Sequence, residues 1–491
     1  MLSILIWLPL AAATVGALLP RAWAGRVALG GSLGALGLAI ALIAGYSSSS
    51  GGLQHVTDTM WISQLGIHYK LGVDGLSLFL VALTALVFAA ASLAANIRGY
   101  DRPGLFFFHF GLAESAVLGA FCAQDLALFV VFFDLMLVPF FFLLAGWGQG
   151  ERRMAATIKL VVFTLTGSLL MLAAAIAVGV MAHAGPNGSV SFAFSDLRAH
   201  LLGNGTQEWV FLFFAAAFLV KMPAFPLHGW MPDGYRAMPI EVLAVFSGVL
   251  SKVGAYGFLR IALPLFPHAS AHFQMLMLLI ALASILYGSV MAFTATHARL
   301  IAGYSSIAQL GFITLGIFSL RPEGAQGALI QMVNHGLVVA PLLLIIGLLA
   351  ARAGGSEDIR DMGGIAFRAP VLAALFLVVA LATLAMPGSA NFVGEFLILL
   401  GVFRAKIVIA LVAFTGVGLA AVYALRLFIR AMHNRTGPDV ESRDIRFADG
   451  VVLVPLVAVI LAFALYPQLA LHRGERSVTS SIAAARTEAA R

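Results

Sequence analysis

The chain consists of apolar stretches of about 20 residues or more that follow one another along almost all of its 491 residues. A helix rises 1.5 Å per residue, so about 20 apolar residues cross the hydrocarbon core of a bilayer. Only 10% of the residues are charged and 61% are hydrophobic, whereas about a quarter of the residues of a soluble protein are charged. The sequence therefore predicts an integral membrane protein.

We expect about fourteen spans, judged by the length that a bilayer requires. Continuous apolar runs favour helices, because the strands of a membrane β-barrel alternate between apolar and polar residues. The sequence thus predicts one all-α polytopic transmembrane domain over residues 1–491. Its expected spans are 2–19, 26–45, 75–96, 105–123, 126–146, 155–183, 208–229, 240–263, 273–295, 298–319, 325–351, 370–402, 406–431 and 449–470.

Several other classes of protein do not fit the sequence. The formal net charge is +7, but Lys and Arg are scattered singly between apolar runs, which argues against nucleic-acid binding. The lone Cys122 allows no disulfide framework. No Lys or Arg precedes Arg21, so the apolar N-terminus is expected to be a retained span and not a cleaved signal peptide. No motif typical of a metal, haem, flavin or nucleotide site is present, and we expect no redox cofactor in this chain.

The loops that follow odd-numbered spans carry most of the basic residues, which predicts that these loops face the cytoplasm and that both termini lie on the other side. The stretches 46–74, with its run from Ser47 to Gly52, and 184–207 are expected to be polar connectors on that other side. The basic residues of the predicted cytoplasmic loops are Arg21, Arg26, Arg98, Arg102, Arg152, Arg153, Arg236, Arg299, Arg352, Arg360, Arg368, Arg430, Arg435, Arg443 and Arg446.

Helix breakers interrupt the seventh and twelfth expected spans, at residues 221–226 and 385–391. A single proline would be read as a kink that neighbouring helices accommodate. Here the two breaks occupy the fourth position of two successive five-helix units, spans 4–8 (105–264) and 9–13 (273–431). An odd number of helices makes the second unit enter from the opposite face, so we expect two inverted repeats, with spans 1–3 and 14 peripheral. Discontinuous helices of this kind often hold ion sites.

Ionisable residues inside the spans are the candidate functional groups, because a charge at the centre of a bilayer is costly unless it faces the bundle interior. Lys221 and Lys252 are expected to bind and release protons, with Asp134 as the partner of Lys221, although static ion pairs are the alternative. His335 is a natural proton shuttle or a buried hydrogen-bonding residue. Glu395 is the candidate terminal carboxylate. Glu114, which is expected to pair locally with Arg or Ser, and Gln309, which can order water, are possible further members.

Five runs of the sequence together resemble one family. They are 133–139, 221–233, 250–257, 302–306 and 392–396, and they are similar to the proton-translocating antiporter-like subunits of NADH-quinone oxidoreductase, respiratory complex I. The resemblance implies a relay through Asp134, Lys221, Lys252, His335 and Glu395. It also implies a non-redox subunit of this enzyme in a bacterial plasma membrane. NADH, flavin, iron–sulfur clusters and quinone would then bind other subunits, and the partners would be neighbouring membrane subunits.

Two residues depart from the pattern that the resemblance implies. Asp134 stands where the family has Glu, so its pairing with Lys221 is expected to be looser or bridged by water. Gln309 stands where a second histidine is usual, which implies ordered water between Lys252 and His335.

A multisubunit sodium/proton antiporter is the alternative function, and a non-transporting scaffold is a third possibility. Continuous buried water between Lys252 and Glu395 would argue against the scaffold.

Overall fold

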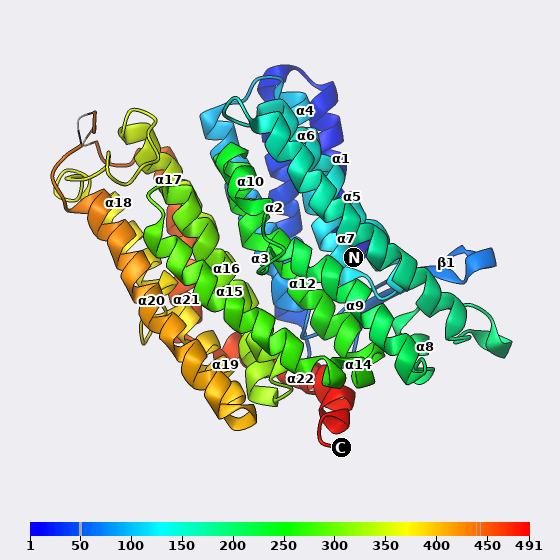
Figure 1. The fold of residues 1–491 in the computed structure, drawn as a ribbon. Coiled ribbons are helices and arrows are strands. Elements are labelled where there is room, and N and C mark those ends of the chain that lie inside the picture. Colours follow the sequence, from blue (N-terminus) through cyan, green and yellow to red (C-terminus); the bar gives the residue numbers. More distant parts are fainter. Residues whose placement is uncertain (49–51, 438, 442) are drawn as a thin grey trace.

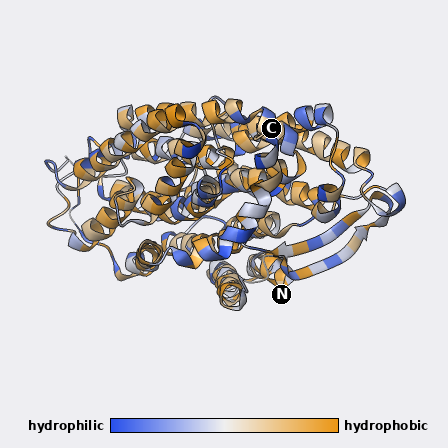
Figure 2. Cartoon of the chain, turned by 90° about the horizontal axis from the view of Figure 1, so that it is seen from below, coloured by the Kyte–Doolittle hydropathy of each residue, from blue (hydrophilic) through white to orange (hydrophobic). Residues whose placement is uncertain are grey.

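The computed structural model describes residues 1–48, 52–437, 439–441 and 443–491. Long helices run side by side to form a bundle, with the outward-facing helices coloured mostly as hydrophobic in Figure 2. The first half of the chain contains α1 Leu2–Leu18, α2 Arg21–Gly45, β1 Gln54–Ile62, η1 Ser63–Leu65, β2 Ile67–Val73, α3 Leu78–Arg98, α4 Pro103–Cys122, α5 Leu126–Leu135, α6 Leu137–Trp147, α7 Arg153–Met181, η2 Pro186–Gly188, α8 Phe194–Ala199, α9 Asn204–Lys221 and α10 Met231–Ala237.

The second half of the chain is helical throughout its regular elements. It contains α11 Ile240–Val245, η3 Phe246–Leu250, α12 Ser251–Gly257, η4 Phe258–Ala262, α13 Leu263–Leu265, α14 Pro267–His272, α15 Gln274–Thr294, α16 Ala298–Phe318, α17 Pro322–Arg352, α18 Pro370–Thr383, α19 Ala390–Ala405, α20 Ile407–Met432, α21 Phe447–Leu465 and α22 Gln468–Glu488. The elements from α11 to α13 form one continuous helix in which η3 and η4 are π turns.

Eleven helices in the described ranges are long and apolar enough to cross a membrane. They coincide with the expected spans except the first, seventh and twelfth. The first forms α1, which has 17 residues. The other two are interrupted: α9 ends at Lys221 and α10 begins at Met231, while α18 ends at Thr383 and α19 begins at Ala390. The chain is thus a mostly helical membrane protein with breaks at both expected places.

The core of the bundle is formed by helices that have no exposed face in this chain. Every residue of α16 is buried, and so is the apolar window of the helix from Ile240 to Leu265. Helix α17 packs against both of them. By contrast, α7 and α20 alternate buried and exposed residues, as expected of helices at the periphery. Polar residues on α16 and on the 240–265 helix are therefore held inside the protein, away from lipid.

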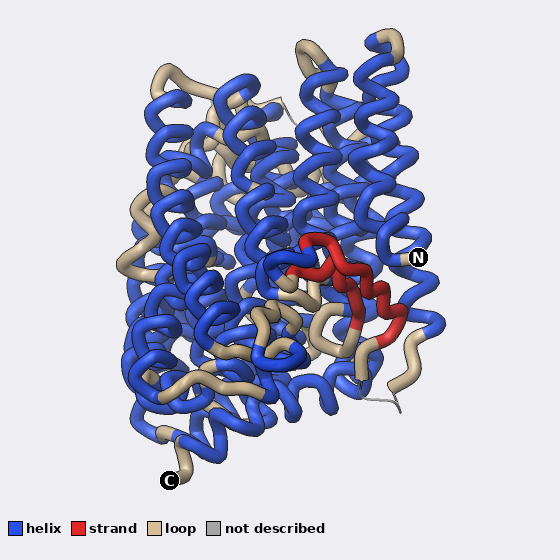
Figure 3. The backbone as a smooth tube through the Cα atoms, turned by 90° about the vertical axis from the view of Figure 1, so that its right-hand side faces the viewer, coloured by secondary structure: helices blue, strands red, loops and turns tan. Residues whose placement is uncertain are grey.

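A β-hairpin replaces part of the connector expected at 46–74. Strands β1 and β2 pair antiparallel, with Asp58 opposite Lys70 and Thr59 opposite Tyr69, and the hairpin lies against one end of the bundle (Figure 3). The expected polar connector therefore contains regular structure over residues 54–73, which the sequence analysis did not anticipate. Strand β1 does not alternate between buried and exposed residues, so the pattern by which a sequence predicts a strand is missing there. Residues 49–51 of the Ser/Gly run lie outside the described residues.

Helix α22 was also not expected from the sequence. It follows α21 at the C-terminus and crosses the end of the bundle (Figure 1). Ser477 of α22 accepts a hydrogen bond from the backbone N–H of Gly75, at 3.1 Å, and Ser481 donates one to the carbonyl oxygen of Leu259. One face of α22 is buried and the other is polar, so the helix closes the bundle end on which the hairpin also lies.

Candidate functional site

Lys221 lies at the end of α9, where the first helix break begins. Its side chain is 5% exposed. Its Nζ atom donates a hydrogen bond of 3.4 Å to the carbonyl oxygen of Phe133 and lies 4.5 Å from the centre of the Phe133 ring. The indole Nε1 of Trp230 donates to the carbonyl oxygen of Val220, which helps to satisfy the backbone at the break. The break therefore holds a buried ammonium group in the bundle interior.

Asp134 follows Phe133 on α5, but its carboxylate forms no ion pair with Lys221 within 4 Å in the described part of the chain. Asp134 is half-buried, and its Oδ1 atom has no hydrogen-bond partner in the protein. The ammonium group reaches the backbone carbonyl of the preceding residue instead. A direct Asp134–Lys221 contact is therefore not made, and the arrangement is as loose as the short side chain of Asp implies.

Lys252 is fully buried and lies between the two π turns of the 240–265 helix. Its Nζ atom donates to the carbonyl oxygen of Ser247 at 2.5 Å and to Oγ of Ser251 at 3.2 Å. The hydroxyl groups of Ser247 and Ser306 lie 3.3 Å apart, which connects this helix to α16. π turns occur often at functional sites. Here the wide turn supplies the oxygen that holds the lysine.

His335 lies in α17 beside the seam between α17 and η3. A Cβ added to Gly336 would lie 2.5 Å from the carbonyl oxygen of Gly248, so the two backbones touch at this point. His335 is 3% exposed and its Nδ1 atom has no hydrogen-bond partner in the described protein. It makes no direct hydrogen bond to Lys252 or Glu395. The structure thus places His335 in the interior of the bundle, without a direct hydrogen bond to either of the two neighbouring members of the expected relay.

Glu395 belongs to a hydrogen-bonded series next to the second helix break. Gln331 Nε2 donates to Oε1 of Gln309 at 2.8 Å, and Gln309 Nε2 donates to Oε1 of Glu395 at 2.7 Å. All three side chains are buried. Gln309 therefore contacts Glu395 directly.

Several buried polar atoms around this series lack a hydrogen-bond partner in the described protein. Buried polar groups nearly always have a partner, in the protein or in ordered water. Seven such atoms, on α17, α19, α20 and the turn before α19, are groups to which ordered water could hydrogen-bond. They are Gln331 Oε1, Asn334 Oδ1, Ser389 Oγ, Asn391 Oδ1 and Nδ2, Glu395 Oε2 and Tyr423 Oη. Tyr423 on α20 was missed in the sequence because tyrosine is neutral and common in apolar helices.

Glu114 on α4 accepts a hydrogen bond of 2.5 Å from the hydroxyl of Ser32 on α2. Of the two kinds of partner expected for Glu114, Arg and Ser, the structure shows a serine. Its second oxygen has no partner in the described protein, and no hydrogen bond among the described residues links Glu114 to the Gln331–Gln309–Glu395 series. Glu114 is therefore apart from the second helix break.

Glu241, which the sequence analysis did not select, is the principal further acidic residue. It lies in the first turn of α11 and is 4% exposed. Tyr100 donates a hydrogen bond to its Oε2, and Nη1 of Arg98 lies 3.5 Å from its Oε1. A cavity of about 220 Å³ opens beside it, lined also by Arg446 and Asp449. Its burial distinguishes Glu241 from an interfacial acid.

Asp74 and Arg260 form a buried ion pair at the opposite end of the same helix. Arg260 donates to both carboxylate oxygens of Asp74, at 2.5 and 2.8 Å, and its Nε donates to Oη of Tyr256 at 2.9 Å. Burial raises the pKa of Asp74, but the charge and hydrogen bonds of Arg260 outweigh burial and hold the pKa below its ordinary value. This pair fixes the hairpin end of the 240–265 helix.

No three His, Cys, Asp or Glu side chains gather closely enough to hold a metal ion in the described ranges. That this chain carries no redox cofactor remains a prediction. The arrangement offers a set of buried proton-binding groups, of which Lys221, Lys252 and Glu395 are held by backbone, hydroxyl or amide partners. Because successive groups do not touch, transfer between them requires intervening water or movement of the side chains.

Comparison with known proteins identifies the family. Residues 123–420 match the family described as NADH:quinone oxidoreductase/Mrp antiporter, TM. Relatives named NADH-quinone oxidoreductase subunit M are 36% identical in Rhodobacter capsulatus, covering 96% of this chain and 94% of that protein, and 37% identical in Escherichia coli K12, covering 92% and 90%.

Solved structures agree with these relatives. A chain in respiratory complex I from Thermus thermophilus with bound NADH is 34% identical and superposes with a TM-score of 0.89, covering 98% of this chain and all of that chain. A chain of the Mrp complex from Dietzia sp. shares the fold, with a TM-score of 0.84 at 22% identity and coverage of 99% and 98%. The chain therefore belongs to the NADH:quinone oxidoreductase/Mrp antiporter family of membrane proteins.

Proposed function

We propose that the chain is a proton-translocating membrane subunit of NADH-quinone oxidoreductase that contains no redox site of its own. The relatives named subunit M, each covered over at least 90% of its length, support this assignment. The observation that carries it is the buried Gln331–Gln309–Glu395 series at the second helix break. Its unpartnered polar neighbours offer hydrogen-bonding groups to water, where an ordinary packing interface would be apolar.

The proposed architecture has fourteen spans and two inverted five-helix repeats. The first repeat runs from α4 to α13 and the second from α15 to α20. In each, the fourth span is broken and an ionisable residue lies beside the break, Lys221 in the first and Glu395 in the second. This correspondence supports the assignment of both residues to equivalent roles in two half-paths.

The proposed path for protons begins at the Arg-rich end of the bundle. Water in the cavity beside Glu241 gives this buried carboxylate access to that end. Glu241 and Lys252 lie on one helix, about 16 Å apart along its axis at 1.5 Å per residue. A proton collected by Glu241 reaches Lys252 when water enters the seam of small residues between η3 and α17.

Coupling to electron transfer acts on the Asp134–Lys221 site. A change of charge in a neighbouring subunit alters the separation of these two groups, which shifts the proton affinity of Lys221. Lys221 then delivers its proton toward Lys252 on the adjacent helix, and His335 and water carry it to Glu395. Glu395 releases it on the side of the hairpin and of α22. Redox centres, NADH and quinone belong to other subunits of the complex.

The proposed orientation places the Arg-rich loops in the cytoplasm and both termini on the opposite side. The uneven distribution of Lys and Arg between the loops of the two ends supports this. Arg299 links the 296–298 turn to Glu357 at 2.6 Å and to the carbonyl oxygen of Met238, while the hairpin, α14 and α22 gather at the other end. Basic residues are retained preferentially on the cytoplasmic side.

Three substitutions test the proposal in the assembled complex: Lys221→Met, Lys252→Met and Glu395→Gln. We expect each to lower proton pumping per electron in inverted membrane vesicles, measured by quenching of a pH-sensitive dye. Lys159→Met is the matched control, because Lys159 is an exposed lysine that pairs with Asp233 on the protein surface. Wild-type pumping stoichiometry in all three variants would overturn the proposal.

A sodium/proton antiporter subunit is the second candidate, favoured by the fold that the chain shares with the Mrp complex. Reconstitution of the purified chain in liposomes separates the two functions. Cation-driven proton exchange by the chain alone would favour the antiporter. Pumping that appears only with NADH oxidation in the complete complex would favour the proposed function.

A further inference from the structure

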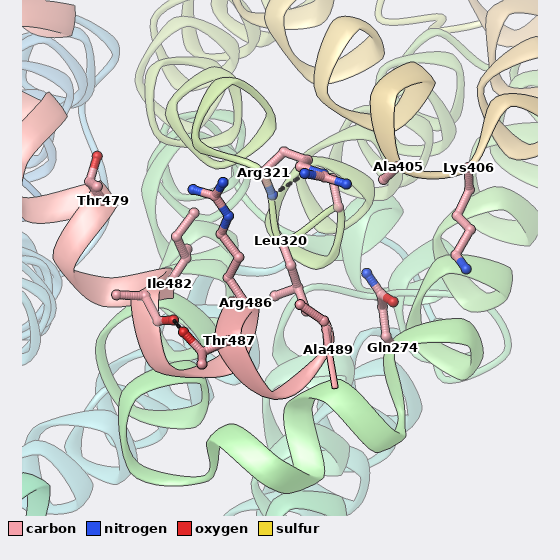
Figure 4. Close-up of a pocket in the computed structure, with 13 residues that line it drawn as sticks. Gln274, Leu320, Arg321, Ala405, Lys406, Thr479, Ile482, Arg486, Thr487 and Ala489 are labelled. Carbon is pink, nitrogen blue, oxygen red and sulfur yellow. Dashed lines mark hydrogen bonds between the residues drawn. The ribbon is translucent and has the colours of Figure 1, made fainter.

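A cavity of about 590 Å³ lies at the bundle end that carries the hairpin and α22. It is bounded by the last turns of α22, by the turns at 319–321 and 405–406, and by Gln274 at the start of α15. Figure 4 shows the side chains of Arg321, Arg486 and Lys406 around this space, each from a different element.

The charges around the cavity are all positive. Arg321, Lys406 and Arg486 line it, and none of the lining residues is acidic. Within the described ranges these three side chains form no ion pair or hydrogen bond. Neighbouring Arg404, by contrast, is paired with Glu323. Three unpaired cations around one cavity form a site that suits a phosphate group, since Arg and Lys are the usual phosphate-binding residues.

An apolar surface adjoins the cavity on the outside of the bundle. It is formed by residues of α15 and α20, two helices that pack against each other. The exposed fractions are 44% for Leu276, 52% for Leu279, 52% for Ile407, 69% for Val408 and 60% for Leu411. These side chains run from the cavity along the membrane-spanning part of both helices, so a molecule bound in the cavity can continue along them.

We propose that this cavity binds the headgroup of an anionic phospholipid whose acyl chains lie along α15 and α20. A free phosphate would satisfy the cations but not the adjoining apolar surface. A zwitterionic lipid would bring its own positive charge to a site that has no carboxylate. The combination of three cations and a continuous apolar strip therefore selects an anionic lipid.

Lipid analysis of the purified complex tests the proposal. The triple variant Arg321→Gln/Lys406→Gln/Arg486→Gln is compared with wild type after detergent washing. The matched control, Arg21→Gln/Arg26→Gln/Arg152→Gln, removes the same charge from the opposite end. We expect wild type and control to retain at least one more anionic phospholipid per complex than the triple variant, counted by native mass spectrometry. A photoreactive phosphatidylglycerol should label α22 in wild type, and at least fivefold less in the triple variant.

Three outcomes would overturn the proposal. One is equal retention of anionic lipid by the triple variant and wild type. Another is loss of labelling on addition of excess inorganic phosphate, which would indicate a free-phosphate site. The last is cross-linking of a Lys406→Cys variant to a neighbouring subunit in place of lipid, which would indicate an acidic protein segment. Retained quinone reductase activity of the triple variant shows that the complex is assembled, so the test does not depend on the proton path.

Discussion

Gln309 Nε2 donates a 2.7 Å hydrogen bond to Oε1 of Glu395, and thereby joins α16 to the second half of the broken twelfth span. The same amide accepts a hydrogen bond from Gln331, so its orientation is fixed. A neutral amide holds the carboxylate without adding a charge of its own. It can therefore donate to Glu395 in either protonation state, because an oxygen of the carboxylate and the carbonyl oxygen of the protonated carboxyl group both accept a hydrogen bond.

Gln309→Leu is expected to lower proton pumping per electron. Leucine has a similar size but leaves the buried carboxyl oxygen of Glu395 without its partner, a loss of about 1–3 kcal/mol. Gln309→His keeps a donor at the site and is expected to retain most of the pumping. Vesicle assays of both variants, normalised to quinone reduction, provide the measurement. Pumping by Gln309→Leu at the wild-type level would contradict this role.

Asp134→Glu tests the loose pairing with Lys221. The added methylene lengthens the side chain by about 1.5 Å, which allows the carboxylate to approach the ammonium group that now contacts Phe133. We expect Asp134→Glu to pump at least as well as wild type and Asp134→Asn to pump several-fold less. Equal pumping by Asp134→Asn and wild type would show that the carboxylate is not required.

Glu241→Gln tests access from the Arg-rich end. The amide preserves the size of the side chain and its contact with Tyr100 but cannot exchange a proton, so pumping should fall about tenfold. Glu323→Gln is the control, because Glu323 is an acid near a membrane surface that pairs with Arg404 away from the cavity. If both variants pump equally well, Glu241 is a structural partner of Arg98 and Tyr100 only.

Arg260→Met is expected to destabilise the complex. It leaves the buried Asp74 carboxylate without a partner, and removal of one member of a buried pair costs about 3–5 kcal/mol. Asp74→Asn in the same chain should restore part of the stability. Thermal unfolding followed by intrinsic fluorescence, with native gels to detect lost subunits, gives the comparison. Equal midpoints for Arg260→Met and wild type would contradict the assigned role.

The contribution of the Asp74–Arg260 pair to the stability of the folded protein is expected to depend on pH. The pKa of Asp74 is below its ordinary value in the folded protein, so the unfolded chain binds a proton more readily. The stabilisation is therefore fully present above about pH 3.9, the ordinary pKa of Asp, and is lost as the pH falls through the folded value. Asp74→Asn should remove this part of the acid sensitivity.

Most of the spans could be predicted because lipid forces continuous apolar helices, and the two breaks were visible as prolines beside Lys221 and Asn391. The hairpin 54–73 and helix α22 could not, because both lie where water is available and many structures satisfy the backbone. Their form is fixed by tertiary contacts such as Gly75–Ser477. A pattern read along the chain does not contain such contacts.

The burial of the candidate residues Lys221, Lys252 and Glu395 could be predicted from the sequence, but the contacts that they make could not. Burial explains why Lys221, Lys252 and Glu395 could be selected, since lipid makes charged residues rare there. Which groups touch depends on rotamers and on helix register. Lys221 contacts a backbone carbonyl and Gln309 contacts Glu395, and neither contact follows from spacing. Glu241 was missed because the end of a span tolerates charge, so only its burial distinguishes it from an interfacial acid.

The two π turns that flank Lys252 have a consequence for chain length. A π turn contains one residue more than an α-helical turn, and each residue advances the direction of the side chain by about 100°. Deletion of a single residue from Phe246–Leu250 would convert the first turn to ordinary geometry. Helix 240–265 would stay intact, but its two ends would be rotated against each other. Either Lys252 would leave the seam between η3 and α17, or Glu241 would leave its cavity. The number of residues between Glu241 and Lys252 is therefore as constrained as their identities.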